Sequence, residues 1–245
     1  MASVHLHHAA LDAIGQEIVD GVRPVGSVLT LADLEQRFTV SRTVAREIMR
    51  ILESLGMVRS RRRVGITIRP RSNWNVLDPL VVGWRLRGDE HDRVLLDVTE
   101  LRAALQPMAA ELAARNATTE QRERLVQLAD EIVRNSRQPE RSAAPGDAEL
   151  EFHMLLLRAT ANELFAGFSG VVRLVERMDG PQSPEPGLVW AERYRRIAAA
   201  VAAGDGETAR IASRAQVAQG LAGMAARVGE RPSIAEPPSS DHWSV

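Results

Sequence analysis

One stretch of the chain, residues 40–55, most constrains how this sequence can fold. Read with helical spacing, its apolar residues share one face at steps of three and four; they are Ala45, Ile48, Leu52 and Leu55. The opposite face begins with three polar residues, Arg42, Thr43 and Arg46. Ser41 stands where an N-cap residue belongs, because its hydroxyl can accept a hydrogen bond from the first turn. Such a helix packs its apolar face on a domain and offers its basic N-terminal end to an anionic partner.

The preceding residues predict a second short helix joined closely to the first. Thr30 and Asp33 have the spacing of a capping box, which would begin a helix that ends near Phe38. Only Thr39 and Val40 separate that helix from Ser41. Two short helices connected this tightly, the second polar at its start, form the helix-turn-helix pattern.

A basic β-hairpin is expected next, after Gly56 at a helix C-cap position. Residues 57–60 and 65–69 are strand-like, and Arg61, Arg62 and Arg63 cluster at the turn between them. Residues 1–73 contain eleven arginines and seven acidic residues, a net charge of +4, whereas the whole 245-residue chain has -1. This segregation of charge is typical of a nucleic-acid-binding module.

The expected partner of residues 41–46 is DNA. In a major groove Arg42 and Arg46 could each donate two hydrogen bonds to guanine, and Thr43 could reach a phosphate or a thymine methyl. Ser41 and the backbone of the helix N-terminus could hold a phosphate, while the basic turn would add attraction that weakens with salt. The alternative is a solvated helix face beside an ordinary basic turn. The order of helix, turn, helix and hairpin favours DNA binding.

From residue 74 onward the pattern is helical. The expected helices cover about 91–116, 118–136, 147–160, 162–178, 188–203 and 205–228, and Pro107 should bend the first of them. The sequence therefore predicts a mainly α protein, with a winged helix-turn-helix domain at 1–73 and an all-α bundle at 74–228. Residues 229–245 are rich in Pro and Ser and are expected to be disordered.

Composition and hydropathy narrow the cellular compartment that we expect for this chain. The chain has no cysteine, which excludes disulfides and thiolate metal sites and fits a cytoplasmic protein. No uninterrupted apolar stretch is long enough to cross a bilayer, and the first residues do not have the pattern of a secretory signal. We therefore expect no membrane partner.

The N-terminal part resembles the winged helix of GntR-family transcription regulators. The resemblance rests on Phe38-x-Val40-Ser41-Arg42-Thr43-x-x-Arg46-Glu47, then Leu52, then Gly56-Met57-Val58, with Gly65 in the wing. It implies that Ser41, Arg42, Thr43, Arg46 and Gly65 contact DNA. One departure is Ala32, which stands where the family often has a DNA-contacting arginine. The operator sequence therefore does not carry over from relatives.

The helical part resembles the FCD-type effector domain of the FadR branch of that family. The matching residues are Glu100-Leu101-Arg102, Glu149-x-x-Phe152-His153, Ala159-x-x-Asn162 and Ile197-x-x-x-Val201-x-x-Gly204-Asp205. Many such domains hold a divalent metal with an Asp and a His four residues apart plus two later histidines. Here the corresponding residues are Glu149, His153, Tyr194 and Gln216. Because the two later imidazoles are missing, we favour a hydrogen-bonded histidine or a direct effector contact over a metal at Glu149 and His153.

The resemblance also implies that Arg102, Glu149, His153, Tyr194 and Gln216 converge in an effector pocket. Arg102 could bind a carboxylate with two parallel hydrogen bonds, or it could be an ion-paired helix residue beside Glu100 or Glu149. Residues 73–84 are similar to those of regulators of sugar-acid catabolism. We therefore expect a small carboxylate effector such as a sugar acid or hydroxy acid.

The leading interpretation is a homodimeric repressor whose operator binding is controlled by this effector. The main alternative is an enzyme that uses Glu149 and His153 as an acid–base pair or as metal ligands, but no nucleophile motif or phosphate-binding loop supports it. A nonspecific DNA-compacting protein conflicts with the near-neutral net charge.

Overall fold

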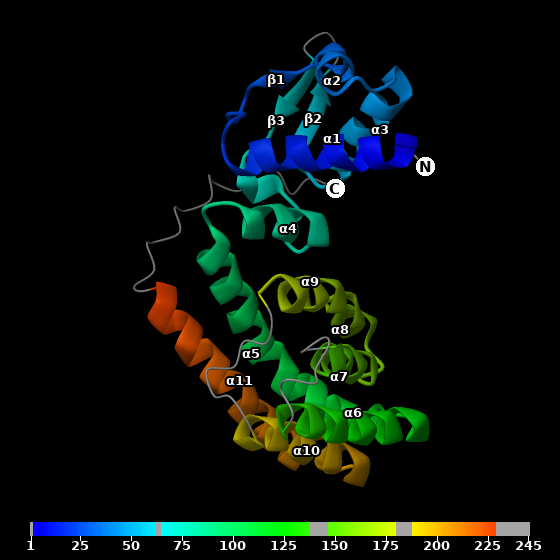
Figure 1. Ribbon diagram of the computed structural model, residues 1–245, viewed down its shortest axis with the longest axis vertical. Helices are drawn as coiled ribbons and strands as arrows, with labels where there is room; N and C mark the ends of the chain where they lie inside the picture. The colour runs from blue at the N-terminus through cyan, green and yellow to red at the C-terminus, as the bar shows by residue number, and fades with distance from the viewer. Residues whose placement is uncertain (1, 62–64, 138–146, 180–187, 229–245) are drawn as a thin grey trace, which may run out of the picture. The chain divides into compact units, whose positions relative to one another are not determined.

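The computed structural model describes residues 2–61, 65–137, 147–179 and 188–228 (Figure 1). The chain divides into two compact units, one ending at His91 and one beginning at Asp92. The expected class is confirmed: the first unit is a helix-turn-helix with a small sheet, and the second is helical. The tail predicted to be disordered lies outside the described residues. No helix in the described part of the chain is long and apolar enough to span a membrane.

The first unit combines helices with one small sheet. Its elements are α1 (Ala2–Val19), β1 (Val28–Leu29), α2 (Leu31–Phe38), α3 (Arg42–Ser54), β2 (Val58–Arg61), β3 (Gly65–Ile68), the 3-10 turn η1 (Arg71–Asn73) and α4 (Pro79–Arg87). The sheet is antiparallel with the order β1-β3-β2. The predicted hairpin is β2 and β3. Sequence reasoning missed β1, because a two-residue strand is too short to show an alternating pattern.

The caps expected around the helix-turn-helix are present. The Thr30 hydroxyl accepts a hydrogen bond from the Asp33 amide at 3.1 Å, and the Asp33 carboxylate accepts one from the Thr30 amide at 2.9 Å. The Ser41 hydroxyl accepts a hydrogen bond from the Val44 amide at 3.3 Å. These contacts satisfy backbone donors that have no partner inside a helix, and they set where α2 and α3 begin.

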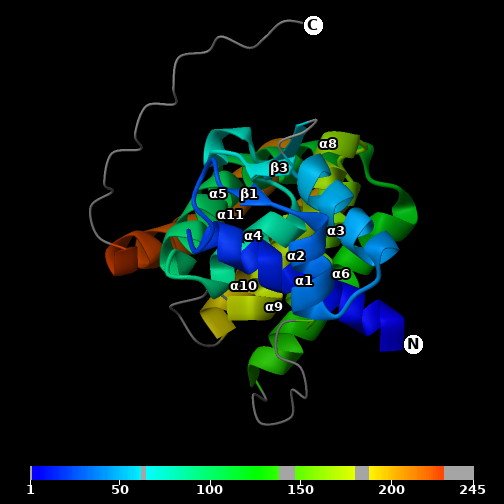
Figure 2. The same ribbon diagram turned by 90° about the horizontal axis from the view of Figure 1, so that it is seen from above.

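The core of the first unit forms around α1 and α3. The apolar face predicted for α3 is buried, since Ala45, Ile48 and Leu52 are each 0% exposed. α1 contacts α2, α3 and α4, an arrangement that can be followed in Figures 1 and 2. Ile14 of α1 and Trp84 of α4 lie fully buried in the same cluster.

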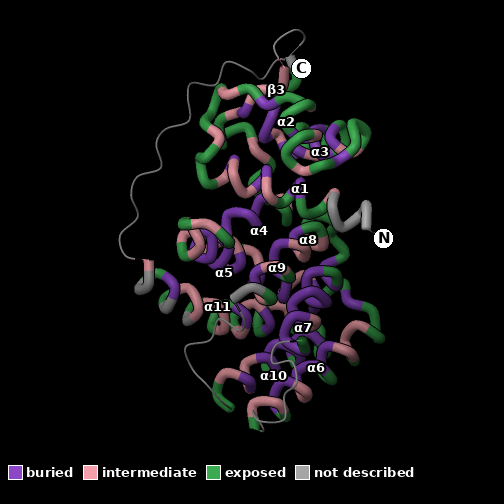
Figure 3. The backbone as a smooth tube through the Cα atoms, turned by 45° about the horizontal axis from the view of Figure 1, so that its top comes forward, coloured by how far each residue is buried: buried purple, intermediate pink, exposed green. Residues whose placement is uncertain are grey.

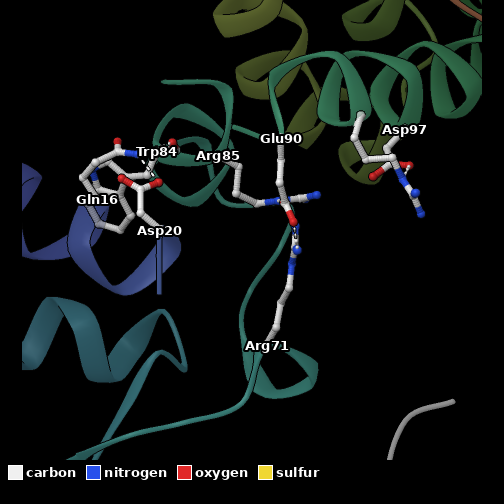
Figure 4. A network of polar contacts seen from close by, with 8 residues as sticks. Gln16, Asp20, Arg71, Trp84, Arg85, Glu90 and Asp97 are labelled. Carbon is white, nitrogen blue, oxygen red and sulfur yellow. Dashed lines mark hydrogen bonds and ion pairs between the residues drawn. The ribbon is translucent and has the colours of Figure 1, made fainter. Parts of the chain in front are cut away.

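α4 belongs to the first unit by its contacts (Figure 4). The Trp84 indole donates a hydrogen bond to Asp12 at 2.7 Å. Gln16 donates one to the Trp84 carbonyl at 3.0 Å. Arg71 donates to both oxygens of Glu90, at 2.7 and 2.5 Å, and Arg85 also pairs with Glu90. The compact unit that contains the winged helix therefore extends beyond residue 73 and includes α4, because α4 packs on α1.

The second unit contains seven helices within the described residues. They are α5 (His91–Asn116, whose first residue belongs to the first unit), α6 (Thr119–Arg137), α7 (Asp147–Arg158), α8 (Glu163–Gly167), α9 (Ser169–Asp179), α10 (Leu188–Ala203) and α11 (Gly206–Val228). Pro107 lies inside α5 as expected. The single helix predicted over 162–178 is wrong: the chain forms α8 and α9, separated at Phe168, which caps α8 and is itself buried.

Gly56 offers a direct test of how the first unit closes. Its φ is +72°, and a Cβ atom there would lie 2.2 Å from the backbone oxygen of Asn73. We expect Gly56→Ala to lower the free energy of unfolding by about 3 kcal/mol, from left-handed strain plus a backbone clash. Urea denaturation of the full chain measures this.

Gly21 is the matched control, because its φ is +71° with nothing within 4 Å of the added atom. Gly21→Ala should cost only about 1 kcal/mol. Equal costs for the two variants would show that the Asn73 contact does not restrict residue 56.

Candidate nucleic-acid interface and buried polar cluster

The first turns of α3 present the predicted DNA-binding residues to solvent. Ser41, Arg42, Thr43 and Arg46 are all exposed. Within the described residues, neither Arg42 nor Arg46 forms an ion pair, whereas the nearby Arg37 is held by Glu17. The guanidinium groups of Arg42 and Arg46 are therefore available to an anionic partner.

The sheet is joined to α3 beside this surface. The Glu53 carboxylate of α3 accepts a hydrogen bond from the Ser60 amide of β2 at 2.9 Å. A surface hollow of about 230 Å³ lies between them, and Arg46 and Ser60 are among its lining residues. This hydrogen bond joins β2 to α3.

The predicted wing residues are only partly described. Arg61 is the last residue of β2, but its side chain and all of Arg62 and Arg63 lie outside the described residues. Gly65 begins β3 with a φ of +106°, and a Cβ atom there would lie 2.8 Å from a methyl carbon of Val28. A glycine is thus required by the sheet itself, whether or not its backbone also touches DNA.

In the second unit, a chain of hydrogen bonds crosses the interior. Gln106 of α5 lies 2.8 Å from Nδ1 of His153, and Nε2 of His153 lies 3.1 Å from the Tyr194 hydroxyl. Gln216 of α11 hydrogen-bonds to the same hydroxyl. His153 is on α7, most of whose residues are buried (Figure 3), and Tyr194 is on α10.

Burial keeps the two central rings uncharged. The pKa of His153 is held well below its usual value, first by burial and then by the positive charge of Arg102. The pKa of Tyr194 is raised well above its usual value, mainly by burial and then by Glu149 and Glu176. Near neutral pH the chain from Gln106 to Tyr194 therefore consists of neutral groups.

Arg102 and Glu176 form a buried ion pair at one side of this chain. Nη1 of Arg102 lies 2.7 Å from the Glu176 carboxylate, and the two side chains are 10% and 8% exposed. Within the described residues, Nε of Arg102 and Oε1 of Gln106 are buried and have no hydrogen-bond partner. Such groups are costly unless a ligand or water completes their hydrogen bonds.

Glu149 brings a second carboxyl group to the cluster. Its side chain is buried on α7, and burial followed by the negative charge of Glu176 raises its pKa to about 8. Glu149 is therefore mostly protonated near neutral pH and can donate a hydrogen bond.

The structure brings the predicted pocket residues together. Arg102, Glu149, His153, Tyr194 and Gln216 all interact directly or through charge with at least one other member. Sequence reasoning missed Gln106 and Glu176. Gln106 follows Arg102 by four residues, and that spacing could have found it; Glu176 has no comparable signal. Sequence reasoning had offered Glu100 or Glu149 as the ion-pair partner of Arg102. In the structure the partner is Glu176.

These residues do not fit a divalent metal. Both nitrogens of His153 are already engaged, by Gln106 and by Tyr194. Across the part of the chain that the structure describes, no three His, Cys, Asp or Glu residues are grouped to hold an ion. A phenol and an amide are poor replacements for two imidazoles. We therefore assign no step to a metal.

The two units define a class of protein, in which a winged helix-turn-helix binds DNA and a helical domain carries a buried polar site. The sequence profile of the gntR family of bacterial regulatory proteins matches residues 6–68, and that of the FCD domain matches residues 97–219. The chain belongs to the GntR family, in its FCD-containing branch, and is a transcriptional regulator with an effector-binding domain. Members of this family are transcription regulators, which are not enzymes.

Two Escherichia coli (strain K12) relatives share much of the chain. The galactonate operon transcriptional repressor is 28% identical over 165 residues, which are 67% of this chain and 71% of the relative. The uncharacterized regulator YieP is 27% identical over 211 residues, which are 85% of this chain and 90% of the relative. The uncharacterized Mycobacterium tuberculosis regulator Rv0494 is 34% identical over 150 residues, which cover 61% of this chain and 59% of the relative.

Solved structures share the fold. A Streptococcus agalactiae GntR protein has a TM-score of 0.51 at 21% identity, covering 89% of this chain and 99% of that one. The Listeria monocytogenes protein Lar has a TM-score of 0.55 at 17% identity, and the match covers 91% of this chain and 97% of Lar.

The raised pKa of Glu149 predicts a particular pH dependence of stability. The folded chain keeps this proton up to about pH 8, whereas an unfolded glutamate loses it near 4.5. Stability should therefore fall as the pH rises through that window, by at most about 1.4 kcal/mol per pH unit. Glu149→Gln should remove this loss. The free energy of unfolding of the variant should therefore rise relative to that of the wild type between pH 5 and 8.

Chemical denaturation at a series of pH values measures the difference. Glu151→Gln is the matched control on the same helix, because the Arg124 hydrogen bond lowers the pKa of Glu151 instead. The difference in free energy of unfolding between Glu151→Gln and the wild type should not change with pH above pH 5. A flat difference for Glu149→Gln as well would contradict the assignment of a protonated Glu149.

Proposed function

We propose that this regulator is a repressor that binds a two-fold symmetric operator as a homodimer in the cytoplasm. The observation that carries the DNA-binding part is the exposed, unpaired state of Arg42 and Arg46 on the N-terminal turns of α3, within the described residues. A single winged helix contacts a short stretch of DNA, and pairing two of them doubles the contacts and sets the half-site spacing. The repressor assignment is supported by the galactonate operon repressor, which shares 28% identity.

We further propose that Ser41, Arg42, Thr43 and Arg46 read the operator, with Arg61, Arg62 and Arg63 of the wing bound to phosphates. Ala32 removes one contact that relatives have, so more of the sequence discrimination falls on Arg42 and Arg46. Gly65 would allow close approach of the wing backbone to DNA. We place the end of the DNA-binding part at residue 73, with α4 packed on it in the same compact unit.

The effector we propose is a small carboxylate, such as a sugar acid or hydroxy acid, bound among Arg102, Glu149, His153, Tyr194 and Gln216. The unpartnered Nε of Arg102 supports an oxygen-bearing ligand, and a protonated Glu149 could donate to a hydroxyl or carboxylate oxygen. The name of the E. coli galactonate repressor points to sugar acids as the first class to test. We propose no turnover: the effector leaves unchanged.

Replacement of the α3 arginines tests the DNA-reading role. Sequencing the genomic fragments that the full-length protein retains should yield discrete sites with inverted repeats. On such a site, Arg42→Ala and Arg46→Ala should each weaken binding roughly 10- to 100-fold, because each loses a base contact of about 1–3 kcal/mol. Fluorescence anisotropy at fixed salt measures the affinity.

Arg134→Ala on α6 is the control, since this exposed arginine is in the second unit. It removes the same charge and should leave the affinity within about twofold. Retention of random fragments, or equal losses for all three variants, would contradict sequence-specific reading.

Calorimetry against a panel of acids tests the effector class. D-Galactonate, D-gluconate and L-lactate are titrated into the wild type and into Arg102→Ala, which should bind the active acid roughly 10- to 100-fold more weakly. Arg124→Ala, which removes a partly exposed, ion-paired arginine of α6, should bind normally. Binding of an acyl-CoA or an amino acid in place of these acids would contradict the proposal that the effector is a sugar acid or hydroxy acid.

A further inference from the structure

The buried ion pair between α5 and α9 has a feature that an ordinary structural pair lacks. Arg102 uses Nη1 for Glu176 at 2.7 Å, while its Nε is buried without a partner among the described residues. A guanidinium grips a carboxylate best with two parallel hydrogen bonds. The internal carboxylate therefore leaves part of the guanidinium unused.

Glu176 comes from α9, a helix that carries no member of the hydrogen-bond chain from Gln106 to Tyr194. α9 packs against α7, which carries Glu149 and His153, and Val171, Val172 and Val175 of α9 are buried. The Glu176 side chain thus joins α9 to Arg102 on α5. Loss of that contact would remove a charged tie between the two helices.

A ligand carboxylate cannot simply join the groups already present. Arg102 would then face two carboxylates in a buried site, that of Glu176 and that of the ligand, because Glu149 is protonated near neutral pH. Like charges brought together away from water repel strongly, and a buried anion without its own cation is costly. Replacement of one carboxylate by another keeps the local charge balanced.

We propose that Glu176 is a resident carboxylate that occupies the position of the ligand's carboxylate on Arg102, so that an acidic effector binds by displacing it and releases α9 from α5. This inference rests on the acidic effector of the proposed function. It makes Glu176 the residue that sets effector affinity, because part of the binding free energy is used to break the internal pair.

The first test needs no effector. Glu176→Ala leaves the Arg102 guanidinium buried beside a space that fits a small carboxylate, and its Tm should fall by roughly 10 °C. Sodium acetate at tens of millimolar should restore much of this loss, whereas acetamide or the same concentration of sodium chloride should not. Differential scanning fluorimetry of the full chain measures the shifts.

Glu151→Ala is the matched control, because it also removes a carboxylate from an arginine, but from a pair with Arg124 whose side chains are 41% and 46% exposed. Acetate should not change its Tm. Equal responses of the two variants to acetate, or no response of Glu176→Ala, would overturn the inference.

The second test uses Glu176→Gln, which keeps the shape of the side chain and loses the charge. By calorimetry it should bind D-galactonate at least tenfold more tightly than the wild type, with no change for the neutral polyol galactitol. Weaker or unchanged binding of D-galactonate would overturn the inference. If neither protein binds any acid, the sugar-acid effector class fails, and the acetate result still decides what Glu176 does.

Discussion

Burial of the apolar face of α3 is the constraint on which the DNA-binding unit depends. Ala45, Ile48 and Leu52 are completely buried, in one cluster with Ile14 of α1 and Trp84 of α4. At about 1.5–3 kcal/mol for each large apolar side chain, this face fixes the rotation of α3 about its own axis. Once the rotation is fixed, Arg42, Thr43 and Arg46 have no alternative but to face solvent.

The second unit also has an apolar core, but it buries a set of polar groups together with that core. Neutral groups run from Gln106 through His153 to Tyr194, and the charged pair of Arg102 and Glu176 lies beside them. Burial makes this arrangement expensive unless every group is paired. Within the described residues, Nε of Arg102 and Oε1 of Gln106 have no partner, so a ligand that hydrogen-bonds to them would stabilise the unit. This is the physical basis for a sensor.

Local signals predicted most of the first unit. The capping box at Thr30, the N-cap Ser41 and the 3.6-residue pattern of α3 all depend on residues within one or two turns of each other, so they are visible in the sequence. β1 was missed because two residues show no periodicity, and the place of α4 was missed because it depends on Trp84 fitting against α1. The break at Phe168 was missed because α8 and α9 read as one continuous helical pattern.

The sequence by itself determined that residues 41–46 form a basic helix start. Family resemblance added the prediction that five polar residues of the helical part lie together: Arg102, Glu149, His153, Tyr194 and Gln216. Only the tertiary structure decided which charges meet. It paired Arg102 with Glu176, 74 positions away in the chain. It also buried Glu149, and burial followed by the negative charge of Glu176 raises the pKa of Glu149 to about 8. The reason is physical: helix periodicity is local, whereas the electrostatics of a buried group depend on whichever helices pack around it.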